Sequence, residues 1–559
     1  MRKGLVLRRL QFRVLYHVFL LRVFDLELMS ANGDPTRLLG QFAVMFSSVS
    51  FLFSLPGLLY LTGRGRLAAD YGWTAEHFFI ATTLTAVGMI TVLNWDSVFP
   101  DRRDVLVLGP LPVRASTLFL AKISALFAAS GLVVVGLNIF SGLVWPLLFS
   151  SGREGALDLM RAWPAYWITV FAAAGFVVCT VLAVQGIAAN LLPRQHFLRL
   201  SAFLQAGVFC ALLSLYILEP HLESPGALTA PGNQRLLAWL PSYWFLGMFQ
   251  QLNGSMHPAF EPLARRAWIA LGTSVLGAAA ALLLSYFRMM PKIVEQPEIL
   301  PGAWNNSWLP NFGNSLRDAI TFFSLRTLLR SRQHRMILSF FSGIGLAIVV
   351  GYVTIFGGLG SVRTGISIAL LIASILMLVF VILGIRVVAA IPISLSANWI
   401  IRVTQVRPSG AYREAVRFSW IALGVAPIWL LVAGLLLTTS PSWQVFGHLV
   451  VLFVLGTLLV ELCLLSFPKI PFTCSYLPGK ANIHIAFWSG LVLLFQLVST
   501  GARFESRVLN RPLNYGLMIL LLAISLAGLR SLTSARARRG AEVVFEEEYP
   551  VDLVSLNLS

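Results

Sequence analysis

Long apolar runs separated by short polar segments make up most of this chain. A helix that crosses a membrane needs about 20 mostly apolar residues, and the sequence holds twelve runs of that kind. They cover residues 39–62, 75–96, 119–143, 165–190, 198–218, 266–288, 335–357, 365–390, 417–438, 444–467, 483–500 and 512–532. The pattern predicts an all-α polytopic membrane protein with about twelve transmembrane helices.

Composition supports the same fold class. Of 559 residues, 57% are hydrophobic and 12% are charged, with a mean hydropathy of +0.78. Soluble domains carry roughly 25% charged residues, so a soluble globular protein is excluded. The four cysteines form no CxxC pair, and the eight histidines show no HxxxH or HExxH spacing. We therefore expect neither a disulfide framework nor a metal site.

The formal net charge of +18 indicates orientation in the membrane. With a cytoplasmic N-terminus, 31 of the 42 Lys and Arg residues fall in cytoplasmic segments or helix ends. The positive-inside rule thus predicts that both termini are cytoplasmic, and we expect the protein in the plasma (inner) membrane. Because the basic residues are spread over seven short segments, they do not indicate a nucleic-acid-binding domain.

The longest predicted cytoplasmic linker divides the twelve runs into two sets of six. A basic amphipathic stretch, suited to a helix in the membrane interface, precedes each set, at residues 5–24 and 315–335. This repetition indicates a duplicated architecture. The predicted divisions are a first six-span unit, a linker, a second six-span unit and a cytoplasmic tail, at residues 1–290, 291–314, 315–532 and 533–559.

The segment between the second and third runs combines charges with helix breakers. Asp101, Arg102, Arg103 and Asp104 form a compact cluster, and Gly109-Pro110-Leu111-Pro112 interrupts regular structure because proline lacks an N–H and restricts its predecessor. The next helix then begins and continues through Lys122. The segment is either a rigid, charged cytoplasmic elbow or an ordinary solvated loop.

These features resemble the transmembrane subunits of ATP-binding-cassette exporters of the type-2 permease class. There, a basic interfacial helix precedes six spans, and the loop after the second span carries a charged cluster, a run ending in Leu-Pro, and a helix that reaches a lysine. The resemblance implies a coupling helix seated on a separate ATPase, formed here by Asp101, Arg102, Arg103, Asp104, Pro110, Pro112 and Lys122. It also implies two ATPase copies that bind ATP, and no cofactor on this chain.

The second half matches this pattern less closely. Its corresponding segment keeps length, charge and an interfacial tryptophan but lacks the Leu-Pro element; its candidate coupling residues are Asn398, Trp399, Arg402, Arg413 and Glu414. The family also tends to have an extracellular re-entrant segment between its fifth and sixth spans. Residues 219–265 provide room for one in the first half, where 240–250 suits a half-buried helical hairpin, whereas residues 501–511 are too few in the second.

Glu461 is the one acid well inside an apolar run. An intramembrane charge is a functional candidate, and the alternative is a structural pair with Arg386, which we favour. The sequence contains no GxxxxGK[ST], GxSxG or GxGxxG motif. We therefore do not expect an enzyme, and ATP hydrolysis would come from the partner.

The sequence as a whole predicts the permease subunit of an ABC-type exporter that moves a lipophilic or amphiphilic substrate. Two six-span units fused in one chain would form the membrane unit, with a homodimer as an alternative. Two other functions stay open. A secondary transporter would use ionisable groups near the midplane, and an integral-membrane transferase would use clustered His, Asp or Glu at a membrane face.

Overall fold

Every element in the described part of the chain is a helix. The computed structural model describes residues 2–24, 35–63, 71–94, 113–150, 156–191, 194–219, 222, 224–254, 257–295, 315–356, 367–391, 410–439, 441–465, 467, 470–472 and 483–538.

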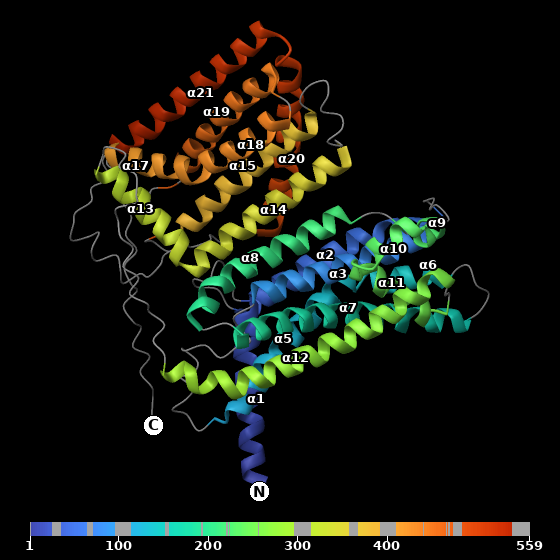
Figure 1. Cartoon of the computed structure of the whole chain (residues 1–559). Coiled ribbons are helices and arrows are strands. Elements are labelled where there is room, and N and C mark those ends of the chain that lie inside the picture. Colours follow the sequence, from blue (N-terminus) through green and yellow to red (C-terminus); the bar gives the residue numbers. More distant parts are fainter. Residues whose placement is uncertain are drawn as a thin grey trace. The chain divides into compact units, whose positions relative to one another are not determined.

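The chain divides into two compact units, Met1–Pro301 (unit 1) and Gly302–Ser559 (unit 2). Their helices are labelled in Figure 1. Unit 1 contains α1 (Arg2–Phe24), α2 (Pro35–Leu61), α3 (Tyr71–Leu93), α5 (Ala115–Asn138), α6 (Ser141–Ser150), α7 (Ala156–Leu191), α8 (Arg194–Leu218), α9 (Pro225–Thr229), α10 (Pro231–Leu237), α11 (Pro241–Leu252), the short η1 (Pro258–Phe260) and α12 (Glu261–Glu295).

Unit 2 contains α13 (Ser315–Arg330), α14 (Arg332–Phe356), α15 (Ile368–Ala389), α17 (Gly410–Trp420), η5 (Ile421–Val425), α18 (Ala426–Thr439), α19 (Trp443–Leu465), α20 (Ile483–Val508) and α21 (Pro512–Arg538). The five residues of η5 form a π-helical turn inside one long apolar helix. Pro427 follows it, and its missing N–H removes one α-helical hydrogen bond at this point.

Ten described helices are long and apolar enough to cross a membrane, which supports an integral membrane protein. They cover ten of the twelve predicted runs. Helix α8 occupies the predicted run 198–218, but its apolar part, Phe203–Leu218, is shorter than a span. Helix α20 covers 483–500 and is also outside the ten; its last turns contain Arg503, Glu505 and Arg507. The twelve-span arrangement stays a prediction.

Each unit has two ends. We call the proximal end the one where the unit's first apolar helix begins, α2 in unit 1 and α14 in unit 2, and the distal end the opposite one. Because successive long helices alternate in direction, α5 and α17 begin at proximal ends. Helices α3, α12, α15 and α19 begin at distal ends, where α20 finishes.

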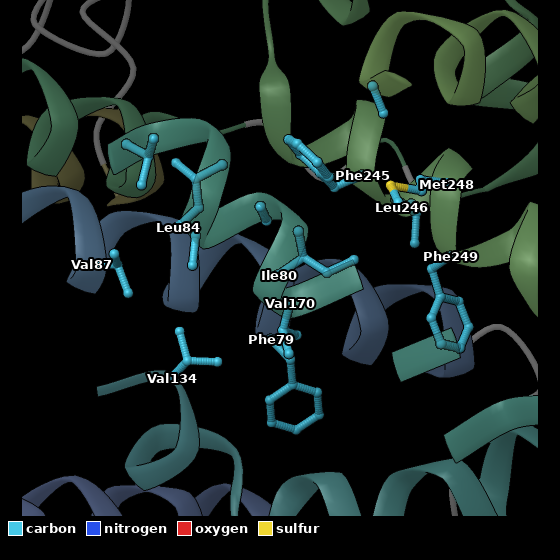
Figure 2. Close-up of a cluster of buried hydrophobic side chains, with 14 of the residues drawn as sticks. Phe79, Ile80, Leu84, Val87, Val134, Val170, Phe245, Leu246, Met248 and Phe249 are labelled. Carbon is cyan, nitrogen blue, oxygen red and sulfur yellow. The ribbon is translucent and has the colours of Figure 1, made fainter. Parts of the chain in front are cut away.

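The core of unit 1 is formed mainly by α3, α5, α7 and α11. Figure 2 shows part of it and labels Phe79 and Ile80 of α3 and Phe245 and Phe249 of α11, which belong to the same buried cluster. Helix α11 has 12 residues, which at about 1.5 Å per residue is too short to cross a hydrocarbon core of about 30 Å. Eight of these residues are nevertheless buried, so α11 packs inside the helical bundle without spanning it.

A helix is present at each position where the sequence predicts an interfacial one. Helix α1 packs along α5, where Phe19 contacts Leu118, Ala121 and Ala125. Helix α13 packs on α17 and buries its small polar residues, Thr321, Ser324 and Thr327. Small residues allow membrane helices to approach closely. In both units, therefore, the first helix packs against the helix that follows the candidate coupling segment.

Candidate functional site

The predicted coupling residues are only partly covered by the structure. Asp101, Arg102, Arg103, Asp104, Pro110, Pro112, Asn398, Trp399 and Arg402 lie outside the described residues. Lys122, Arg413 and Glu414 are described, and each lies at the proximal end of its unit.

Lys122 lies on α5 and is buried against α1. Its Nζ is 5.3 Å from the centroid of the Phe19 ring, a cation–π contact. The surrounding side chains come from both helices and include Leu118 and Ala121. The lysine therefore joins α1 to the start of the helix that follows the first candidate coupling segment.

Arg413 and Glu414 connect the start of α17 to two other helices. The Arg413 guanidinium donates to the Thr533 carbonyl of α21 at 2.6 Å. The Glu414 carboxylate accepts from Arg317 of α13 at 3.1 Å, and the Arg317 guanidinium also lies 4.9 Å from the Phe418 ring centroid. The end of the second candidate coupling segment is thus attached to α13 and α21.

Glu461 lies beside this attachment point and is 1% exposed. Its carboxylate forms ion pairs with Arg417 of α17 and Arg530 of α21, the latter at 3.4 Å. It also accepts a hydrogen bond from Thr533 Oγ1 at 3.3 Å. Through Thr533 the structure brings Glu461 together with Arg413, two residues that the sequence analysis had named separately.

The partners of Glu461 differ from the Arg386 that the sequence suggested. The Arg386 guanidinium lies 4.6 Å from the Phe467 ring centroid, in a cation–π contact beyond the end of α19. The physical reason is the helix arrangement: α17 and α21 both pack against α19. These two helices provide Arg417 and Arg530 to the Glu461 carboxylate. The Arg386 guanidinium of α15 contacts the Phe467 ring.

Phe472 links three helices at the same end of unit 2. It is buried and has φ of 65°, a left-handed conformation that is strained for a bulky side chain. Its N–H donates to the Ala389 carbonyl at 2.7 Å. Its ring lies 5.4 Å from His334 of α14 and 6.0 Å from Phe323 of α13. The turn at 470–472 thus fixes α13 and α14 to the end of α15.

The distal end of unit 1 carries a buried polar cluster around α11. Gln250 donates to the Glu76 carboxylate, and Ser242 donates to Glu219. His77 Nε2 lies 3.3 Å from Glu219 Oε1, and its ring stacks on Tyr243 at 4.1 Å. Polar contacts to α3 and to the end of α8 therefore hold both ends of α11.

The distal end of unit 2 carries a second buried chain of polar groups. Ser374 Oγ lies 2.8 Å from His448 Nε2, and His448 Nδ1 lies 2.7 Å from Glu505 Oε1. The three residues come from α15, α19 and α20, and each is at most 6% exposed.

Sequence reasoning missed the residues of both distal clusters. His448 lies inside the predicted run 444–467, and Glu505 lies in the predicted outer segment 501–511. For Glu76, His77 and His448 the available signal is an ionisable residue a few positions inside the end of an apolar run, whereas Glu505 lies beyond its run and gives no such signal. Among the described residues, no group of three His, Cys, Asp or Glu side chains could hold a metal ion.

No protein-family model, curated protein sequence or solved structure matches this chain.

Proposed function

We propose that this chain is the membrane-spanning permease subunit of an ABC-type exporter, powered by a separate ATPase. The proposal combines the coupling-segment motif at 94–122 with one structural observation. In each unit, the first helix packs against the helix that follows the candidate coupling segment, α1 on α5 and α13 on α17. A force applied to either segment would therefore act on a helix pair and not on a single helix.

The contacts of unit 2 support a force path from its coupling segment into the membrane. Arg413 and Glu414 attach the start of α17 to α21 and α13, and Arg417, one helical turn further, pairs with Glu461 of α19. These contacts join four helices at one end. A displacement of the segment would therefore move the proximal end as a packed body.

In this proposal the proximal ends and both termini are cytoplasmic, and the distal ends face outward. The buried helix α11 then lies at the outer end of unit 1, as a re-entrant segment between the two last spans. Closure of two ATP-bound ATPase subunits would push on 98–115 and 392–416, and the packed units would open a path outward. The apolar character of the spans favours a lipophilic or amphiphilic substrate.

The test begins with the reading frames next to this chain's gene, where we expect one that encodes an ATPase with P-loop and signature motifs. The full chain and the ATPase are co-purified, placed in liposomes, and assayed for ATP hydrolysis. We expect a stable complex whose ATPase rate falls when the charged cluster is replaced by alanine, at Asp101, Arg102, Arg103 and Asp104 together.

A matched control is a second quadruple alanine variant that removes two acids and two bases around the start of α7, at Arg153, Glu154, Asp158 and Arg161. This variant should keep the wild-type ATPase rate. If no ATPase co-purifies with the wild-type chain, or if both quadruple variants keep the wild-type ATPase rate, the coupling role is rejected.

A further inference from the structure

The distal end of unit 2 holds an imidazole and a carboxylate in direct contact within an apolar bundle. His448 is fully buried and Glu505 is 3% exposed, and their closest atoms, Nδ1 and Oε1, are 2.7 Å apart. Ionisable side chains in such surroundings are costly and usually have a function. The pair lies near the end of α20, close to the distal aqueous phase.

The charge of the pair depends on one proton. A neutral imidazole beside a carboxylate leaves a net charge of −1 in the bundle, and a lone buried charge is strongly unfavourable. One added proton makes the pair an imidazolium and a carboxylate with no net charge. No other charged side chain faces His448 from the described helices around it. Helices α15, α17 and α21 carry their charged residues at the proximal end, and α18 has none. Arg503 and Arg507 of α20, and Arg511 just before α21, are exposed. Tyr515 of α21 is the nearest other titratable group, and its hydroxyl donates to the Gly447 carbonyl.

Ser374 gives both protonation states a complete set of hydrogen bonds. Its Oγ lies 2.9 Å from the Leu371 carbonyl and 2.8 Å from His448 Nε2. When the imidazole is neutral, the serine hydroxyl donates to Nε2. When the imidazole is protonated, Nε2–H donates to Oγ and the hydroxyl donates to Leu371. The heavy atoms need not move, because only the hydroxyl hydrogen rotates.

We propose that Ser374, His448 and Glu505 form a proton-binding site in the distal half of unit 2, loaded from the distal aqueous phase. The proton adds to Nε2 of the neutral imidazole, Glu505 balances its charge, and Ser374 turns from donor to acceptor. Because the three side chains come from α15, α19 and α20, proton occupancy sets how strongly these helices are held together at that end. This proton site is proposed independently of whether a separate ATPase drives transport.

The order Ser–His–Glu also matches the nucleophile, base and orienting acid of hydrolases, but the surroundings of Ser374 oppose catalysis. Its Oγ is buried, so a substrate ester has no access to it. The neighbouring backbone N–H groups lie within helix α15 and are used by its hydrogen bonds, so they provide no oxyanion hole. We therefore assign the serine to proton binding.

The direct test follows the protonation state of His448 in the full-length chain, labelled with ¹⁵N-histidine and reconstituted in lipid bilayers. Solid-state NMR distinguishes one-proton and two-proton imidazoles by their nitrogen shifts, and loss of a signal in His448→Gln assigns the residue. We expect the His448 signals to change from the two-proton to the one-proton form as the pH is raised. Glu505→Gln should lower the proton affinity at least tenfold, because the balancing charge is gone.

Three further variants keep the test decisive. Ser374→Ala removes the switching hydroxyl and should also shift the titration of His448, whereas Ser374→Thr should restore it. Glu261→Gln, which changes an exposed glutamate of unit 1, should leave it unchanged. The proposal is overturned if His448 keeps one form throughout, if Glu505→Gln and Ser374→Ala both leave the titration unchanged, or if a fluorophosphonate probe labels Ser374. None of these readouts requires an ATPase, so they are independent of the test of the exporter.

Discussion

Removing one arginine from Glu461 tests whether the proximal charge cluster holds unit 2 together. Glu461 is 1% exposed and its main partner, Arg417, has a side chain that is 17% exposed, whereas the side chain of Arg530 is 49% exposed. Breaking a buried pair leaves an uncompensated charge and costs about 3–5 kcal/mol. With Arg530 and Thr533 still present, we expect Arg417→Ala to cost about 3 kcal/mol, the lower end of that range.

The other substitutions at this cluster should cost less, in a defined order. Arg530 is half exposed, so Arg530→Ala should cost about 1 kcal/mol or less. Glu461→Gln removes the buried charge itself and loses charge-assisted hydrogen bonds, which corresponds to about 1.5–3 kcal/mol. The expected order of destabilisation is therefore Arg417→Ala first, Glu461→Gln second and Arg530→Ala last.

Thermal unfolding of the full chain in detergent or nanodiscs measures these differences. For a unit of this size, about 3 kcal/mol corresponds to a Tm decrease of roughly 6–12 °C. The double variant Arg417→Ala with Glu461→Gln should be more stable than the sum of the single effects predicts, because the buried charge is gone. Additive single effects, or a larger loss for Arg530→Ala than for Arg417→Ala, would refute the reasoning.

Two further predictions concern α11. A Cβ at Gly247 would lie 2.7–2.9 Å from atoms of α12 and the preceding turn. Gly247→Ala should therefore lower the Tm by an amount equivalent to about 1–3 kcal/mol. The control Gly226→Ala, whose Cβ meets no atom within 4 Å, should change the Tm little. Gln250→Leu leaves the buried Glu76 carboxylate without its donor and should cost about 1–3 kcal/mol, whereas Gln251→Leu, at an exposed position, should cost less in the same assay.

The apolar pattern predicted the membrane helices because hydropathy over some 20 residues depends little on tertiary contacts. It was least reliable where polar residues occupy the end of a helix. The first turns of α8 contain Arg194 and His196, and the last turns of α20 contain Glu505. Such ends lower the mean hydropathy of a helix although the helix itself continues.

The sequence selected Glu461 because an acid in an apolar run is conspicuous, but it could not show which helix lies opposite. Arg386 was the expected partner because it lies near the cytoplasmic end of its predicted span. In the structure, α17 and α21 pack on α19 and provide Arg417 and Arg530 as the partners of Glu461. The distal clusters were missed for a related reason. His448 and Glu505 are 57 residues apart in sequence, and only the folded arrangement of α19 and α20 makes them a pair.

The described polar contacts between α19 and other helices lie near its two ends, and the middle of this helix packs differently. There Gly456 meets Val425 so closely that a Cβ would lie 2.7 Å from it, and the neighbouring side chains are apolar. Apolar contacts have little directional preference, so the register of α19 against its neighbours depends mainly on Glu461 at one end and His448 at the other. The two residues are 13 positions apart, or about 20 Å along a helix. Because a helix is stiff over that length, in the proposed exporter a shift imposed on α17 through Arg417 would reach the distal cluster as a displacement of the whole of α19.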